Sequence, residues 1–139
     1  MKEALKEAQK AYDAGEVPVG AVVVCNKQII ARAHNLTERL CDVTAHAEMQ
    51  AITAAANAIG GKYLNDCTLY VTIEPCAMCA GALYWSQVGK VVYGAGDDKK
   101  GYTTISDALM HPKTIIEKGI MAEESTDLMQ RFFRERRKT

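Results

Sequence analysis

Residues 74–79, Glu74-Pro75-Cys76-Ala77-Met78-Cys79, join an apolar run of strand-forming residues to a helix-forming segment. Two cysteines separated by two residues can place both sulfurs on one tetrahedral metal ion, and zinc is the usual ion for such thiolates. Pro75 favours the start of a helix at this point, because proline is common in the first helical turn. A cysteine pair is an incomplete metal site, so a further ligand must come from elsewhere in the chain.

The best candidate for that ligand is His46, in the stretch Thr44-Ala45-His46-Ala47-Glu48. Together with Cys76 and Cys79 it would give three protein ligands and leave a fourth position for water. An open position of this kind is typical of catalytic zinc, whereas sites closed by four protein ligands are structural. Glu48 is then expected to stand beside that water as a proton carrier and not as a ligand.

The composition is that of one soluble globular domain spanning residues 1–139, with 48% hydrophobic and 24% charged residues. No apolar run approaches the length of a transmembrane helix, so no membrane association is expected. The charged first residues lack the apolar centre of a signal peptide, and five cysteines are an odd number. These features predict a cytoplasmic protein without a disulfide framework.

The order of apolar patterns predicts an α/β fold, a sheet with helices on both of its faces. Helices are expected over about 2–14, 45–59, 77–86 and 122–138, and a short one over 103–110. Thr44 is the expected N-cap of the second helix, with Met49, Ile52, Ala56 and Ile59 on its apolar side. Strands are expected over 21–25, 28–31, 68–73, 88–93 and 114–117.

Several residues allow more than one interpretation. Cys41 could add a fourth ligand, but a loop or buried thiol is preferred, and His34 and His111 are expected to be surface or hydrogen-bonding residues. Tyr84-Trp85 is expected in the core or at a subunit interface. The basic segment 131–138 could contact phosphates or form a solvated final helix, with Leu128, Met129, Phe132 and Phe133 on the buried side of that helix.

A histidine and glutamate one residue apart, followed by Pro-Cys-x-x-Cys, is the known signature of zinc-dependent nucleobase deaminases. Over nearly the whole chain the sequence resembles the cytidine deaminase-like superfamily and, within it, the bacterial tRNA-specific adenosine deaminases. The resemblance rests on five further blocks of sequence. These are Glu16–Ala21, His34-Asn35, Leu69–Ala82, Val91–Ala95 and Phe132–Arg137.

The resemblance implies a three-layer α/β/α fold with a five-stranded mixed sheet, one zinc ion per subunit and a homodimer. The implied reaction is the hydrolytic conversion of adenosine to inosine at the wobble position of a tRNA anticodon, with release of ammonia. The tRNA anticodon stem-loop would be the partner, lying along the basic final helix. By this likeness Asn35 would hydrogen-bond the flipped nucleotide, Asp97 and the loop around it would contact the RNA, and Ala47, Arg134 and Arg137 are further expected substrate contacts. Glu74 could be a solvated charge at the end of a strand, but its position beside Pro75 and the metal favours a contact to the substrate or to the backbone of a metal ligand.

The sequence departs from the family pattern in the loops that border the substrate side. Val43 stands where proline is usual, the residues after Gly101 differ, and the segment between Pro112 and Gly119 is shortened. Tyr84-Trp85 also resembles the guanine deaminases, which share the metal motif. A deaminase of a free base or nucleoside, of the guanine or cytosine type, is therefore the alternative, and a non-catalytic zinc protein is a third interpretation that Glu48 disfavours.

Overall fold

The computed structural model describes residues 1–137, which form one five-stranded sheet with helices on both faces. The strands are β1 (Gly20–Cys25), β2 (Gln28–His34), β3 (Cys67–Ile73), β4 (Lys90–Ala95) and β5 (Ile115–Lys118). The helices are α1 (Lys2–Asp13), α2 (Ala47–Ile59), α3 (Ala77–Ser86) and α4 (Ala122–Arg137), with a 3-10 turn η1 (Tyr102–Thr104). Lys138, the expected end of the last helix, lies outside the described residues.

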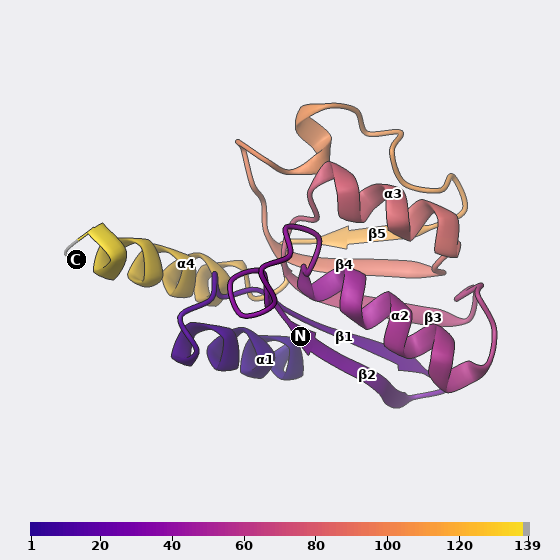
Figure 1. Ribbon diagram of the computed structural model, residues 1–139. Coiled ribbons are helices and arrows are strands. Elements are labelled where there is room, and N and C mark those ends of the chain that lie inside the picture. Colours follow the sequence, from indigo (N-terminus) through magenta and orange to yellow (C-terminus); the bar gives the residue numbers. More distant parts are fainter. Residues whose placement is uncertain (138–139) are drawn as a thin grey trace.

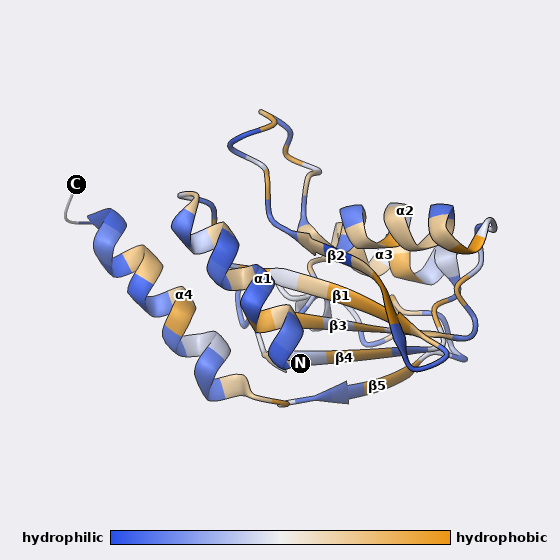
Figure 2. Cartoon of the chain, turned by 90° about the horizontal axis from the view of Figure 1, so that it is seen from below, coloured by the Kyte–Doolittle hydropathy of each residue, from blue (hydrophilic) through white to orange (hydrophobic). Residues whose placement is uncertain are grey.

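The sheet has the order β2-β1-β3-β4-β5 and is mixed. Strand β1 pairs antiparallel with β2 and β3, while β3, β4 and β5 are parallel. Helices α1 and α4 lie together on one face, and α2 and α3 cover the other (Figures 1 and 2). The predicted three-layer α/β/α fold is confirmed. Because β3 and β4 are parallel, the loops that follow them meet at one edge of the sheet.

The hairpin between β1 and β2 follows the predicted pattern. Asn26 and Lys27 have φ angles of 52° and 64°, and two consecutive positive values are typical of the tight turn that suits strand twist. Strand β2 continues past its expected end at Ala31 to His34, which pairs with Gly20. The continuous apolar character of β1 is explained by helices on both of its faces.

Helix α2 differs from the prediction in its start and in its buried face. It begins at Ala47, with His46 as N-cap, and Thr44 instead hydrogen-bonds to Asp42. Its fully buried side consists of small residues, Ala47, Ala51 and Ala55, whereas Ile59 is 42% exposed. Of the expected apolar residues, Ile52 and Ala56 are partly buried and pack against the core, whereas Ile59 is exposed and the most buried positions belong to the alanines.

Three further expectations are corrected. Strand β4 runs through Gly94 to Ala95, and a side chain at Gly94 would meet the Thr72 carbonyl oxygen and Ser125. The expected helix over 103–110 is not formed: these residues make the end of η1 and then turns. Thr103 is held by the Glu74 carboxylate, and helical hydrogen bonding does not continue along the segment. On α4, Leu128 and Phe132 are buried, but Phe133 is 42% exposed.

None of the helices within residues 1–137 combines the length and the apolar character needed to cross a membrane.

Candidate metal centre and substrate cavity

Three metal-ligand side chains converge where helices α2 and α3 begin. Nδ1 of His46 lies 3.6 Å from Sγ of Cys76 and 3.5 Å from Sγ of Cys79. One ligand atom from each of the three side chains lies within 4.8 Å of the others, and they form the only such group in the described part of the chain. One nitrogen and two sulfur donors at this spacing fit a tetrahedral zinc ion with one open position. The structure thus brings together the three residues expected from the sequence.

Helix starts explain why residues so far apart in sequence can share a metal. His46 and Cys76 are both N-cap residues in extended conformation, and Cys79 lies in the first turn of α3. Gln50 supports this arrangement on α2, where its amide donates to the carbonyl oxygens of His34 and Ala45 at 2.8 and 3.1 Å. The unpaired N–H groups of two helix ends supply partial positive charge, which favours thiolate ligands.

The protonation of the metal-free cluster reflects these contacts. A hydrogen bond from the Cys79 thiol, with a further one from His46, lowers the pKa of Cys76 to about 4. Donating that bond raises the pKa of Cys79, and burial raises it further. The hydrogen bond to Cys76 raises the pKa of His46 above its ordinary value. Without metal, one thiolate is therefore present at neutral pH and is stabilised by two neighbouring donors.

Glu48 lies in the first turn of α2 and is only 3% exposed. Burial raises the pKa of its carboxyl group to about 7. A group that titrates near neutral pH can both accept and release a proton under ordinary conditions, as a general acid–base requires. Glu48 also lines the same cavity as His46 and Cys76.

The other candidate ligands lie elsewhere. Cys41 is an exposed loop residue whose thiol donates to the Glu38 carbonyl oxygen at 3.7 Å. His34 lies 3.5 Å from Glu7, and His111 accepts a hydrogen bond from the Lys113 backbone. All three are outside the metal-ligand group, in agreement with the preferred interpretations.

Tyr84 and Trp85 do not line the cavity. Trp85 is 77% exposed on α3, so of its two expected places, the core or a subunit interface, the core is wrong.

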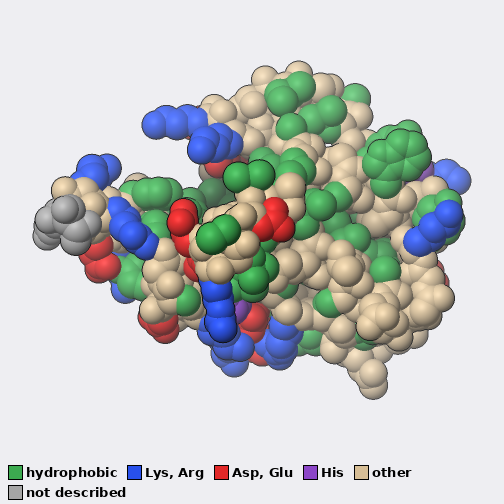
Figure 3. All heavy atoms as spheres, in the orientation of Figure 1, with side chains coloured by type: hydrophobic (Ala, Val, Ile, Leu, Met, Phe, Trp, Pro, Cys, Tyr) green, Lys and Arg blue, Asp and Glu red, His purple; other side chains and the backbone are tan. Residues whose placement is uncertain are grey.

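A cavity of about 1110 Å³ opens beside the metal-ligand cluster, and every substrate-contact residue expected from the sequence lines it. These residues come from five parts of the fold. They are Asn35 after β2, Ala47 on α2, Glu74 and Asp97 in the loops after β3 and β4, and Arg134 and Arg137 on α4. In the space-filling view a hollow lies between the loop after β4 and helix α4 (Figure 3). The cavity thus joins the metal-ligand cluster to a basic helix face.

Asn35 and Asp97 already have hydrogen-bond partners within the protein. Asn35 is buried, donates to the Val17 carbonyl oxygen at 3.4 Å and accepts from the Thr37 backbone N–H at 3.3 Å. One carboxylate oxygen of Asp97 accepts the backbone N–H groups of Lys99 and Lys100, each at 3.0 Å.

The sequence interpretation missed other residues that line the cavity. On α4 these are Met129, Gln130 and Phe133, which share one helix face with Arg134 and Arg137. Gln130 lies four residues before Arg134 and Phe133 four before Arg137, a spacing that would have placed them on the same helix face. Lys99 and Lys100 also line the cavity; they belong to the loop around Asp97, which was expected to contact RNA, but neither lysine was named.

Comparisons with known proteins find related deaminases. A family model described as MafB19-like deaminase matches residues 1–137. The chain is 50% identical to a protein of Bacillus subtilis strain 168 named tRNA-specific adenosine deaminase, over 99% of this chain and 89% of that protein. A solved structure from a study of A-to-I editing by tRNA:A34 deaminases at the wobble position superposes with a TM-score of 0.85 and 39% identity, covering 92% of this chain and 96% of that one.

A guanine deaminase structure from Bacillus subtilis is also similar, with a TM-score of 0.67 and 31% identity over 94% of this chain and 90% of that one.

Proposed function

Because the chain belongs to the MafB19-like deaminase family, we propose that it is a zinc-dependent hydrolytic deaminase that converts adenosine to inosine at the wobble position of a tRNA anticodon. The observation that carries this proposal is the position of Glu48. Its buried carboxyl group shares a cavity with a cluster of one histidine and two cysteines, and that cavity is bordered by a basic helix. A purely structural metal site has no need of such a proton carrier.

His46, Cys76 and Cys79 would hold the zinc ion, which supplies activation of water by lowering its pKa towards about 7. Glu48 would take a proton from the attacking water and give it to the ring nitrogen beside the amine-bearing carbon. That protonation makes the carbon electrophilic enough for addition. Glu48 would then take the second proton from the added hydroxyl group, which becomes the product carbonyl, and pass it to the departing amine, so that the C–N bond breaks and ammonia leaves.

The substrate would enter as a nucleotide turned out of its loop. In this proposal Asn35 hydrogen-bonds the nucleotide, Ala47 forms part of the wall beside it, and Asp97 contacts the RNA near the rim. Arg134 and Arg137 would contact phosphates, since both lie on the cavity side of α4. Single-stranded loops are the usual targets of sequence-specific RNA recognition, because their bases can be splayed out.

A deaminase of a free base is the second candidate, favoured by the similarity to a guanine deaminase structure. The dimensions and charge of the cavity support the RNA substrate more strongly. A free base is small and uncharged and would leave the four basic residues of the rim, Lys99, Lys100, Arg134 and Arg137, without partners. A phosphodiester chain would engage them.

The test is inosine formation in an anticodon stem-loop with adenosine at the wobble position, using zinc-loaded protein. A stem-loop with guanosine at that position is the control, and free guanine, cytosine and adenosine are assayed for ammonia release. Inosine at the wobble position alone is expected. Ammonia from a free base without reaction on RNA would instead assign the protein to nucleobase metabolism.

We also propose that residues 1–139 form a single deaminase domain that acts as a homodimer in the cytoplasm. The exposed apolar side chains of Val43 and Trp85 support a subunit interface, since large side chains of this type are costly to leave in water. The five cysteines form no disulfides, which suits a reducing compartment. Sedimentation at several protein concentrations would test the dimer, and a monomer throughout would reject it.

A further inference from the structure

The side chain of Glu74 is directed into protein and is only 6% exposed, although it follows β3 at the edge of the cavity. Its Oε1 atom accepts the backbone N–H of Asp97 at 3.2 Å. Its Oε2 atom accepts the backbone N–H and the hydroxyl of Thr103, at 3.0 and 2.8 Å. One buried carboxylate therefore binds both ends of the loop that runs from residue 97 to 103.

The backbone of the two residues that follow Glu74 holds the same loop. The carbonyl oxygen of Pro75 accepts the N–H of Tyr102 at 2.9 Å, and Cys76 forms an isolated antiparallel bridge with Gly101. The segment that delivers the metal ligand Cys76 is thus also the support of the loop. The position of the loop is fixed relative to the metal-ligand cluster and not merely to the sheet.

Close packing at Gly101 shows how tightly the loop surrounds the carboxylate. A Cβ atom at this position would overlap Oε2 of Glu74 and approach the carbonyl oxygen of Asp97. Only glycine allows the backbone to pass so close to a buried charged group.

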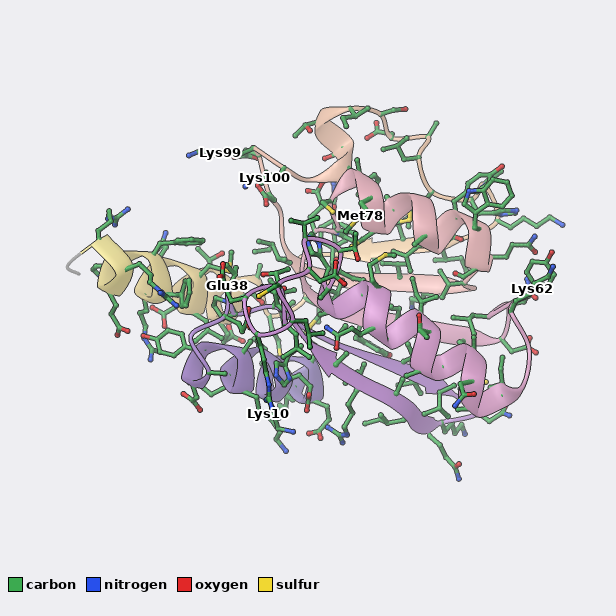
Figure 4. The ribbon with its side chains drawn as sticks, in the orientation of Figure 1. Lys10, Glu38, Lys62, Met78, Lys99 and Lys100 are labelled. Atoms are coloured by element: carbon green, nitrogen blue, oxygen red, sulfur yellow. The ribbon has the colours of Figure 1, made fainter. Side chains whose placement is uncertain are left out.

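The loop then builds outward from this buried support. Asp97, held by Glu74 through its N–H, uses its own carboxylate to accept the N–H groups of Lys99 and Lys100. Both lysines line the cavity, and their side chains extend from the loop on the side that faces α4 (Figure 4). The Glu74 carboxylate thus holds Asp97, and the Asp97 carboxylate in turn holds the backbone of the two lysines at the cavity.

We propose that Glu74 is a positioning residue, which holds the 97–103 loop as one wall of the substrate cavity and does not itself contact the substrate. This inference rests on the proposed function, because it places the loop that would contact RNA. It differs from the substrate contact that the position of Glu74 in the sequence suggested, since three protein donors already occupy the Glu74 carboxylate.

The role requires a carboxylate, because all of the groups around it are donors. Glutamine has the same shape but one acceptor oxygen only. If that oxygen took the place of Oε2, the amide NH₂ would face the N–H of Asp97, and two donors would meet in a buried site. Hydrogen bonds to charged groups are the stronger ones, and a buried donor left unpaired is costly.

The test compares full-length, zinc-loaded Glu74→Gln with the parent chain by amide hydrogen exchange. Exchange is expected to be at least about tenfold faster at residues 97–103, with little change in β1 and β3. The matched control is Glu7→Gln, which alters another buried carboxylate on α1, outside the cavity, and should leave loop exchange unchanged. Unchanged loop exchange in Glu74→Gln would overturn the inference.

Kinetics on the anticodon stem-loop provide the second readout. The Glu74→Gln variant is expected to retain one zinc ion per chain and to show a KM raised about tenfold, with a much smaller change in kcat. A lowered kcat with unchanged KM would overturn the positioning role. If the parent chain has no activity on RNA, the proposed function fails, while the exchange measurement still decides the role of Glu74.

A milder pair of variants guards against misfolding of Glu74→Gln. Thr103→Val removes only the hydroxyl contact to Oε2, and a smaller increase in loop exchange is expected. Thr103→Ser keeps the hydroxyl and should behave like the parent chain. Equal exchange in the valine and serine variants would overturn the inference.

Discussion

His46 and Cys76 occupy equivalent positions in different helices: each is the N-cap residue, in extended conformation, of α2 and α3 respectively. Two helix N-termini therefore point at one cluster of ligand atoms. This arrangement accounts for both the spacing of the ligands and the stability of a thiolate there, because the partial positive charges of both helix ends act on the same sulfurs.

Loss of a ligand should abolish metal binding. We expect Cys76→Ala to purify with little or no zinc, because two remaining ligands do not make a stable site. Zinc content per chain, measured by elemental analysis, checks this expectation. Cys41→Ala is the control, since Cys41 is an exposed thiol outside the cluster and should keep full occupancy. Full zinc occupancy in Cys76→Ala would reject the ligand assignment.

Removal of the proton carrier should separate metal binding from catalysis. Glu48→Gln is expected to keep its fold and its zinc and to lose turnover by a factor of about 10² to 10⁴, the usual contribution of general acid–base catalysis. Zinc content and circular dichroism are measured beside inosine formation. If this variant lost its metal, Glu48 would have to be reassigned as a ligand.

Because the pKa of Cys76 is lowered, we expect its alkylation in the metal-free protein to depend little on pH. With a pKa of about 4, its sulfur is already a thiolate at pH 5.5, so alkylation by iodoacetamide should change little between pH 5.5 and 8. A free cysteine in solution, with a pKa near 8.5, should instead react faster as the pH rises. Peptide mass spectrometry at several pH values measures both rates, and added zinc should protect Cys76. A strong rise in Cys76 alkylation over this pH range would contradict the lowered pKa.

The basic face of α4 should determine the salt dependence of RNA binding. Replacement of Arg134 and Arg137 by alanine is expected to weaken binding and to reduce the slope of log K against log salt by about 1.4, near 0.7 for each lost phosphate contact to a single strand. The control removes two charges outside the cavity, Lys62 and Lys113, and should retain most of the slope. Equal slopes for the two double variants would show that the helix face makes no specific phosphate contacts.

Core packing gives a prediction independent of function. Leu69 lies in the middle of β3 and is fully buried, so Leu69→Ala should lower the free energy of unfolding by about 3 kcal/mol through lost burial and an unfilled cavity. Ile115→Ala, at an exposed position of β5, should change it by less than about 0.5 kcal/mol. Denaturant titration of both variants provides the comparison. A similar loss in both would mean that β3 is not the centre of the core.

Short local signals were enough to predict that His46, Cys76 and Cys79 lie together, because the histidine and the cysteines are placed by helix starts. Helix α3 was expected at 77–86 and was found there. The N-cap of α2 was missed because Thr44 prefers a turn with Asp42, an alternative that the local sequence also allows.

The remaining errors have tertiary causes. Periodicity placed Ile52 and Ala56 on the core side of α2 but did not reveal that its most buried residues are the alanines at 47, 51 and 55. Phe133 has the character of a core residue but lines the cavity, so its hydrophobicity alone predicted the wrong environment. The proposed role of Glu74 depends on hydrogen bonds to residues 97 and 103, which are distant in sequence and could not be predicted from the local pattern.

The order of strands in the sheet has a consequence for the kinetics of folding. The β1–β2 hairpin is local and can form early, but β1 must also pair with β3, which closes the long loop between Cys25 and Cys67. The two cysteine ligands follow β3, whereas the histidine ligand lies within that loop. Metal uptake by a refolding chain should therefore lag behind hairpin formation and report the closure of the sheet.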